Sequence, residues 1–369
     1  MTHRERVLTL LGGGKPDRVP WFADLDYWTT AKIARGEVDA DFKRSTEYID
    51  WHEELGCGFY LQGFFPFRAT TQECSVTTSA HEATGSRIRT IETPQGRLTE
   101  RHRYLPTSFS EAAVEHLVEG PEDLRAYRSF VENTTFEPDY EWARERAAQI
   151  GDRGVLVVYT PRTPFMHLVA IDAGLENLMG IMMEAPDELD ETLDVMRASS
   201  SVAAGIAADC PADIVMIPEN LSAEMVGPAY FERFLRNVQS EWSARIRASG
   251  KHSCIHMDGT LRGLLREECA VGLSFIEACT PAPVGDVAVG EWPEFRAGSE
   301  TVLWGGIPGV YFTPSVGDDE FDRFVVGVLE VMRREPRYVL GVADQVPPDG
   351  LERRIRRVAT LVEQHGRYE

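Results

Sequence analysis

The chain has 369 residues, of which 43% are hydrophobic and 26% are charged, a composition typical of a globular protein in water. Its formal net charge of −21 argues against a nucleic-acid partner, because nucleic acids are bound through clustered Lys and Arg side chains. The sequence has neither an apolar run long enough to span a membrane nor the apolar core of a signal peptide. We therefore expect a cytoplasmic protein with no membrane partner.

The order of the predicted elements indicates a barrel. Thr2 and Glu5 precede an aliphatic run as in a capping box, which predicts a first helix that ends at glycines 12–14. Short apolar runs then alternate with stretches of helical period. Eight such units predict an α/β fold, a (βα)8 TIM barrel, with a doubly wound open sheet as the alternative. The predicted strands lie near residues 19–24, 57–62, 154–159, 213–217, 251–256, 273–277, 301–305 and 337–342.

Residues 72–106 interrupt this repeat after the second strand. Alternating Thr, Arg and Ile residues flank a turn at residues 94–96, which predicts an inserted β-hairpin. An insertion at this point of a barrel lies over the catalytic face, so it is a candidate lid or partner surface. No linker sets it apart, and we expect residues 1–369 to form a single domain.

Polar residues follow most of the predicted strands, and residues in such places converge on the mouth of a barrel. Most of the charged ones are carboxylates, which repel one another unless a cation, a shared proton or the guanidinium of Arg162 compensates them. This concentration of acids is the physical reason to expect a metal. The candidates are Asp24, Asp26, Gln62, Tyr159, Arg162, Glu219, Asn220, His256, Asp258, Glu277, Cys279, Asp344 and Gln345.

The fifth predicted strand runs into the sequence Cys-Ile-His-Met-Asp-Gly at residues 254–259. Cys254, His256 and Asp258 alternate along it, so their side chains point to one side of the sheet. Taken alone, the motif fits a structural histidine and a turn-forming aspartate better than a site. The acids predicted at the same mouth favour the functional interpretation.

Two glycine-rich segments have features of phosphate-binding loops. Residues 12–15 follow a helix instead of a strand and lack a hydroxyl residue after Lys15, so we interpret them as a turn. Residues 305–309, Gly-Gly-Ile-Pro-Gly, follow the seventh strand, where barrels often bind an anion through backbone amides. A tight turn is the equal alternative there.

Several motifs in chain order resemble the uroporphyrinogen decarboxylase superfamily. The resemblance spans nearly the whole chain and implies a (βα)8 barrel. The superfamily includes the haem-pathway decarboxylase and zinc-dependent methyltransferases that exchange methyl groups with corrinoid proteins. The motifs are Arg4-Glu-Arg-Val7, Lys15-Pro-Asp-Arg-Val-Pro20, His256-Met-Asp-Gly259, Trp304-Gly-Gly-Ile-Pro-Gly309 and Gly341-Val-Ala-Asp-Gln-Val-Pro-Pro-Asp349.

The resemblance is closer to the methyltransferase branch. The decarboxylases carry an arginine-rich segment after the first strand that holds the carboxylates of a porphyrinogen. This chain has Asp24 and Asp26 there, and these acids would repel such a substrate. The methyltransferases bind zinc through a His-x-Cys-Gly element and a later Cys. The matching positions hold His256, Asp258 and Asp344, so that both thiolates are replaced by carboxylates.

The resemblance therefore implies a metal-dependent methyltransferase that acts on a small substrate, with a corrinoid protein as a further partner and a homodimer as a conceivable assembly. His256, Asp258 and Asp344 would bind a divalent ion, zinc first, with iron(II) or manganese(II) as alternatives. Glu277 or Glu219 would be a fourth ligand or a proton carrier. The residues expected to contact substrate are Tyr159, Arg162, Gln62 and Asn220.

Two alternatives stay open. A metal-free decarboxylase or lyase would use Asp24, Asp26 and His256 as acids and bases on a small carboxylate substrate. A non-catalytic partner of a corrinoid or similar carrier protein would use the insertion at residues 75–105 as its docking surface.

Overall fold

The computed structural model describes residues 1–369 apart from 61–62 and 82–84. Contacts between Cα atoms divide the chain into two compact units. The first comprises Met1–Phe64, Tyr140–Tyr159 and Ala208–Glu369, and the second comprises Phe65–Asp139 and Thr160–Ala207. That the whole chain acts as one domain stays a prediction.

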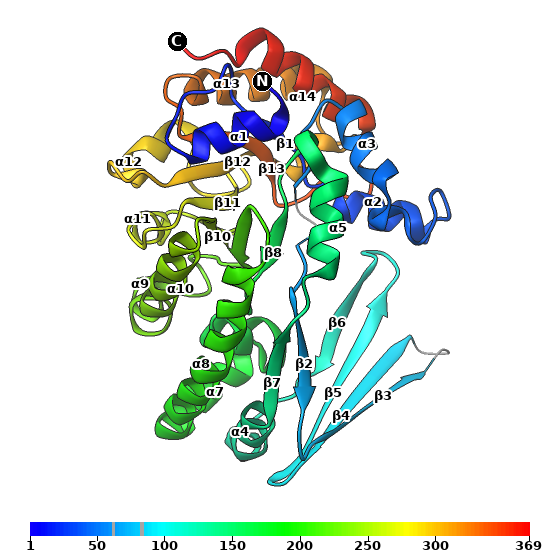
Figure 1. The fold of residues 1–369 in the computed structure, drawn as a ribbon, viewed down its shortest axis with the longest axis vertical. Coiled ribbons are helices and arrows are strands. Elements are labelled where there is room, and N and C mark those ends of the chain that lie inside the picture. The colour runs from blue at the N-terminus through cyan, green and yellow to red at the C-terminus, as the bar shows by residue number, and fades with distance from the viewer. Residues whose placement is uncertain (61–62, 82–84) are drawn as a thin grey trace. The chain divides into compact units, whose positions relative to one another are not determined.

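A seven-stranded parallel sheet lies at the centre of the first unit (Figure 1). Its spatial order is β1-β13-β12-β11-β10-β9-β8. With its flanking helices it has the α/β architecture of the (βα)8 family, as the sequence predicts. The strands are β1 (Trp21–Phe22), β8 (Val157–Tyr159), β9 (Ile214–Ile217), β10 (His252–His256), β11 (Phe275–Cys279), β12 (Val302–Pro308) and β13 (Tyr338–Ala343).

Of the second predicted strand, near residues 57–62, the structure describes residues 57–60, which form isolated bridges. Phe22 of β1 pairs with Gly58, and Phe59 pairs with Gly154 ahead of β8, both in parallel. A Cβ atom on Gly58 would lie 2.3 Å from the Phe22 ring, so only glycine allows this approach. The bridges lie at the two edges of the sheet, where an eighth strand of a barrel is expected.

Helices connect successive strands of the first unit. The predicted capping box is present, because the Thr2 side chain accepts from the Glu5 amide. The helices are α1 (His3–Leu11), α2 (Asp26–Ala34), α3 (Thr46–Glu54), α5 (Glu141–Ile150), α9 (Gly227–Tyr230), α10 (Arg236–Ala248), α11 (Leu265–Cys269), α12 (Trp292–Arg296), α13 (Asp318–Met332) and α14 (Glu352–His365). Shorter turns are η1 (Phe42–Arg44), η4 (Gly151–Arg153), η6 (Phe231–Leu235), η7 (Val289–Glu291) and η8 (Gly309–Phe312).

The glycine-rich segment at residues 305–309 differs from both expectations for it. Its first four residues continue β12 instead of forming a turn or an anion-binding loop after the strand. A Cβ atom on Gly305 would lie 2.4 Å from the carbonyl oxygen of Cys279. The glycine therefore serves the close approach of β11 and β12.

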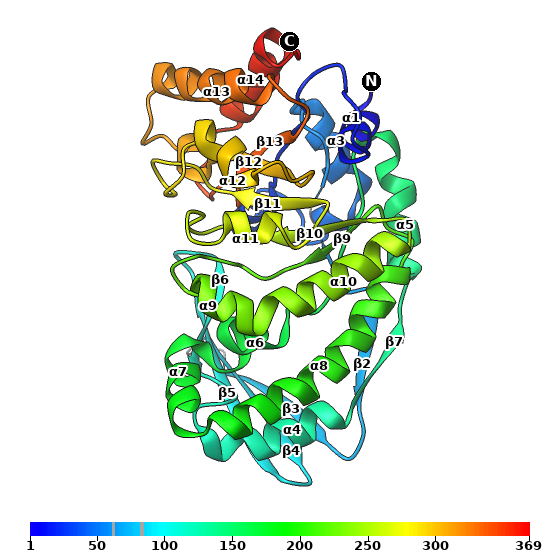
Figure 2. The ribbon, with the colours of Figure 1, turned by 90° about the vertical axis from the view of Figure 1, so that its left-hand side faces the viewer.

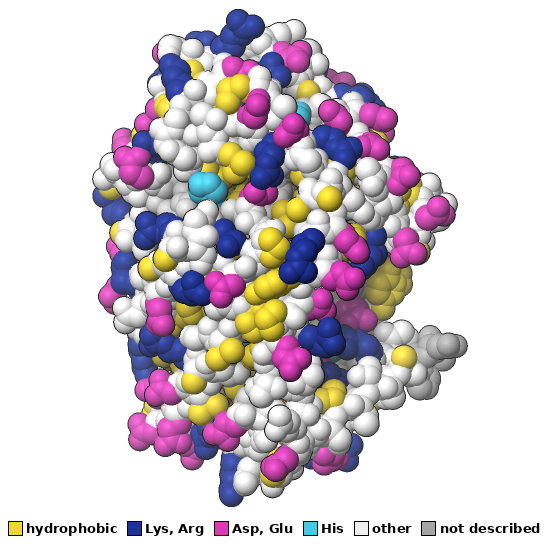
Figure 3. All heavy atoms as spheres, viewed as in Figure 1, with side chains coloured by type: hydrophobic (Ala, Val, Ile, Leu, Met, Phe, Trp, Pro, Cys, Tyr) yellow, Lys and Arg dark blue, Asp and Glu magenta, His cyan; other side chains and the backbone are white. Residues whose placement is uncertain are grey.

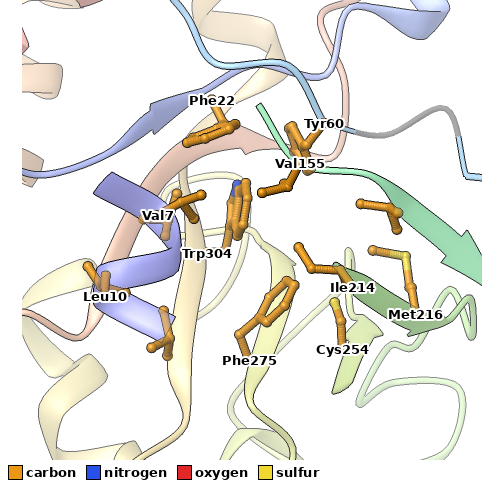
Figure 4. Packing of buried hydrophobic residues seen from close by; sticks show 13 residues of the cluster. Val7, Leu10, Phe22, Tyr60, Val155, Ile214, Met216, Cys254, Phe275 and Trp304 are labelled. Atoms are coloured by element: carbon orange, nitrogen blue, oxygen red, sulfur yellow. The ribbon is translucent and has the colours of Figure 1, made fainter. Parts of the chain in front are cut away.

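Trp304 lies at the centre of the buried apolar cluster of the first unit (Figure 4). Its ring centroid lies 4.5 Å from that of Tyr60, 5.1 Å from that of Phe22 and 5.3 Å from that of Phe275. Such aromatic contacts bury large apolar areas and favour one packing arrangement. The cluster also includes Val7 of α1, so the first helix and the strands share one core.

The second unit contains two antiparallel sheets (Figure 1). The predicted hairpin is present, with its turn after Thr93, but it belongs to a four-stranded sheet in the order β3-β4-β5-β6. Helix α4 packs on β4 and β5 (Figure 2). The strands are β2 (Phe67–Thr71), β3 (Ser75–His81), β4 (Ser86–Thr93), β5 (Gly96–Leu105), β6 (Ser110–Glu115) and β7 (Thr134–Pro138). The helices are η3 (Pro121–Asp123), α4 (Leu124–Glu132), α6 (Pro164–His167), η5 (Leu168–Asp172), α7 (Gly174–Glu184) and α8 (Pro186–Asp209).

The surface carries both charge signs. On the face drawn in Figure 3, acidic and basic side chains are interspersed, although acids outnumber bases in the chain as a whole. Among the helices of the described residues, none is both long and apolar enough to cross a membrane.

His52 of α3 links the stability of the first unit to pH. The ring is buried between Tyr48 and Phe59, and its Nδ1 atom lies 2.7 Å from the Tyr48 carbonyl oxygen. Burial lowers the pKa of His52 from 6.5 to about 4, although the hydrogen bond to Tyr48 opposes this shift. As the pH falls from about 6.5 to about 4, His52 of the unfolded chain takes up a proton, whereas the buried ring of the folded chain stays neutral. The folded state therefore loses stability over this pH range.

We predict that His52→Asn reduces the acid sensitivity of folding. Asparagine keeps the donor to Tyr48 but does not titrate. Between pH 7 and pH 4 the free energy of unfolding of the wild type should fall by about 3 kcal/mol more than that of the variant. Urea unfolding at several pH values measures this difference. Equal losses in the two proteins would contradict it.

Candidate metal centre

His256 ends β10, and Glu277 lies opposite it on the neighbouring strand β11 in the parallel register. The Nδ1 atom of His256 lies 2.5 Å from Oε2 of Glu277, and the hydroxyl of Tyr60 donates to the other carboxylate oxygen at 3.0 Å. Glu277 is fully buried, and the imidazole is 13% exposed. Because Nδ1 binds Glu277, the Nε2 atom is left to face the other acids.

Two aspartates lie close to that free side of the imidazole. Oδ2 of Asp258 is 3.8 Å and Oδ1 of Asp344 is 3.7 Å from Nε2 of His256. One ligand atom from each of the three residues lies within 4.8 Å of the others. The predicted set His256, Asp258 and Asp344 therefore converges on one point, and its spacing fits a shared divalent ion.

Local backbone geometry places Asp344. The residue directly follows β13 and has φ 69°, a left-handed conformation that aspartate adopts more readily than most residues. Asp258 follows β10 by two positions and continues the alternation of the strand, as the sequence predicts. The third residue of that alternation, Cys254, belongs to the buried apolar cluster.

The acids and the imidazole shift one another's protonation. Burial opposes the charged imidazole, but Glu277 and Asp258 raise the pKa of His256 well above its usual value. Burial raises the pKa of Asp344 to about 6, with Asp258 and Glu277 adding to the shift and His256 opposing it. The repulsion between the neighbouring carboxylates contributes to these shifts, and a bound cation would relieve it.

Asp24 and Asp26 lie beside this group, on the loop after β1 and at the start of α2. Oδ1 of Asp24 accepts from the Asp26 amide at 2.8 Å, and Asp26 forms an ion pair of 2.6 Å with Lys43. Burial, followed by the charges of Asp26 and Asp344, raises the pKa of Asp24 well above its usual range. Asp24 therefore keeps its proton to a higher pH than an exposed aspartate does.

A cavity of about 350 Å³ is lined by Asp24 and Asp26. Lys43 and Arg44 of η1 line it, and the Arg44 guanidinium lies 4.4 Å from the Trp142 ring centroid. Tyr159 and Gln345, which are both predicted site residues, also line this cavity. The sequence analysis did not identify Lys43 and Arg44 as site residues, because η1 follows no strand. Two adjacent basic residues in an acidic chain could have indicated an anion-binding position.

Other predicted site residues lie elsewhere. Glu219 is buried, and its carboxylate lies 3.5 Å from the side-chain amide of Gln239 on α10. Asn220 is exposed and has φ 52°. Arg162 belongs to the second unit and lines a cavity there. Gln62 lies outside the described residues, so its proposed substrate contact stays a prediction.

The buried thiols do not supply the missing thiolate ligands. Cys254 and Cys279 are fully buried, and burial raises the pKa of both thiols well above the usual value. Thiols in such surroundings are protonated and inert. The donor set of the centre is therefore one imidazole and carboxylate oxygens.

Comparison with known proteins places the chain in a family. The sequence profile of the uroporphyrinogen decarboxylase (URO-D) family matches residues 114–365, which is more than half of the chain. The protein therefore belongs to the uroporphyrinogen decarboxylase family. No curated protein matches the sequence.

Two solved structures illustrate how far the fold is shared. A methyltransferase from Methanosarcina mazei is 15% identical, covers 99% of both chains and superposes with a TM-score of 0.61. This similarity concerns the fold. A GH20 catalytic module of the pneumococcal exo-β-D-N-acetylglucosaminidase StrH is 10% identical over 61% of this chain and 62% of its own, with a TM-score of 0.33, which is too low to support an argument.

We predict that the purified protein holds about one divalent ion per chain. The double variant Asp258→Asn with Asp344→Asn should lose it, because a lone imidazole binds a divalent ion weakly. Elemental analysis and calorimetric titration with zinc measure the content and affinity. The matched control is Asp319→Asn with Glu320→Gln, which removes two exposed acids of α13. Equal ion content in the two double variants would contradict the site.

Proposed function

We propose that the protein is a metal-dependent methyltransferase of the uroporphyrinogen decarboxylase family that acts on a small substrate. The convergence of His256, Asp258 and Asp344 at the ends of two strands carries this proposal. It is supported by the family match and by the fold shared with the Methanosarcina mazei methyltransferase. The proposed methyl carrier is a corrinoid protein.

The three side chains fit a borderline or hard divalent ion. Imidazole and carboxylate donors suit zinc, iron(II) and manganese(II), with open positions left for substrate. When bound, such an ion supplies Lewis-acid stabilisation of charge on a substrate thiol, hydroxyl or ether oxygen. Glu277 accepts from Nδ1 of His256 and thereby fixes the ring and its tautomer for a metal at Nε2.

The neighbouring cavity suits the substrate. Arg44 provides positive charge for an anionic group, and the rings of Trp142 and Tyr159 provide apolar walls. Burial raises the pKa of Asp24, so this carboxyl group suits a role in exchanging a proton with the substrate. Asp26 and Lys43, which form an ion pair, both line this cavity.

A metal-free decarboxylase acting on a small carboxylate is the second candidate. The buried Asp24 favours it, because burial raises the pKa of this carboxyl group and a raised pKa suits a proton donor. The two candidates differ in their response to chelation. Carbon dioxide release that survives exhaustive chelation would favour the decarboxylase.

We predict that Glu277→Gln weakens zinc binding about 10- to 100-fold, because the neutral amide orients the imidazole less strongly and makes it a poorer ligand. Competition with a chromophoric chelator measures the affinity. Glu268→Gln is the matched control, since Glu268 is another fully buried glutamate, on α11. The proposed role of Glu277 fails if the two variants bind zinc equally well.

The activity test uses methylcobalamin as donor and a small thiol as acceptor. The zinc-loaded protein should demethylate the corrinoid, which changes its visible absorption, and chelation should abolish the reaction. Asp258→Asn with Asp344→Asn should reduce the rate about 100-fold, whereas the exposed double variant of α13 should not. Unchanged turnover by the chelated protein would refute metal dependence.

A further inference from the structure

A second cavity lies wholly within the second unit, between its sheets and helices α4, α6 and α8. Its volume is about 280 Å³, near the lower end of the range for small-molecule sites. Apolar side chains form much of its wall, including Phe130, Phe136, Ile171 and Met196. None of these residues takes part in the metal centre.

Polar groups are held at another part of this wall. The carboxylate of Asp172 is 5% exposed and accepts from the Tyr127 hydroxyl at 2.6 Å and from Nε2 of His167 at 2.9 Å. Burial opposes ionisation of Asp172, but His167 and Tyr127 outweigh it and lower the pKa of Asp172 below its usual value. The imidazole of His167, which lines the cavity, is thus fixed in orientation.

A π-helical turn creates this arrangement. The amide of Ala173 donates to the carbonyl of Leu168 at 2.9 Å, five residues earlier, within η5. Residues five apart diverge on an α-helix, whereas the wider turn brings His167 and Asp172 to one side. π-helical turns occur often at functional sites.

Two guanidinium groups complete the lining. Arg89 pairs with the buried Glu100 at 3.0 Å and lies 5.9 Å from the centroid of the Phe130 ring. Arg162, which the sequence marked as an anion-binding residue, lines the same cavity. Glu100 compensates Arg89 and Asp172 holds His167, whereas Arg162 brings a further basic group to the same lining.

We propose that this cavity binds a small carboxylate with an apolar body. The planar carboxylate matches the forked donors of Arg162. The apolar part of the ligand would pack against Phe130 and Phe136. The site does not depend on the metal centre or on the reaction proposed there.

Binding of phenylacetate tests this proposal, with phenylacetamide as its uncharged counterpart. Calorimetry and saturation-transfer NMR should show saturable binding of phenylacetate and roughly tenfold weaker binding of the amide. Arg162→Met removes the charge, and Ser200→Phe fills the cavity; each should weaken phenylacetate binding at least roughly tenfold. Arg103→Met, an exposed arginine of β5, is the matched control and should bind as the wild type does.

Arg162→Lys keeps the proposal testable if Arg162→Met does not fold: it keeps the charge but loses the forked donors, so phenylacetate should bind it about three- to tenfold more weakly than the wild type. Circular dichroism checks the fold of each variant. Hexanoate and indole-3-acetate are tested in parallel. The proposal is overturned if none of the three carboxylates saturates the protein below about 10 mM, if the amide binds equally well, or if Ser200→Phe binds as the wild type does.

Discussion

The contact between Glu277 and His256 is the constraint on which the candidate centre depends. A fully buried carboxylate is costly unless its oxygens are paired, and here Tyr60 and His256 each pair with one oxygen. The parallel register of β10 and β11 sets His256 opposite Glu277. Once Nδ1 is bound in this way, the geometry of the ring directs Nε2 toward Asp258 and Asp344.

The negative charges of the acids around this contact are offset in different ways. These differences suggest a different role for each acid. Burial raises the pKa of Asp24 and so favours its uncharged, protonated form. Asp26 is neutralised by Lys43. Asp258 and Asp344 share the imidazole of His256 at distances near 4 Å, which is too long for strong ion pairs. A divalent ion among these three residues would shorten the separations and complete the compensation.

Much of the first unit follows from periodicity. Apolar runs located seven strands of the sheet. Of the residues that alternate along β10, Cys254 lies in the apolar core and His256 lies beside Glu277. Asp344 was found because it directly follows β13. In each case a regular strand fixes where the side chains point.

Side chains outside regular strands escaped this reasoning. Glu219 lies two residues beyond the end of β9, so strand alternation no longer applies, and its carboxylate lies 3.5 Å from the side-chain amide of Gln239. Lys43 and Arg44 reach the cavity from a short turn that has no periodic signal. The π-helical turn that joins His167 to Asp172 depends on tertiary packing, which local propensity does not encode.

X-ray absorption spectroscopy of the zinc-loaded protein tests the central claim most directly. The account predicts a first coordination shell of nitrogen and oxygen atoms at about 2.0–2.2 Å, with imidazole scattering from one histidine. A shell of sulfur at about 2.3 Å, or zinc without a histidine ligand, would contradict a centre built from His256, Asp258 and Asp344.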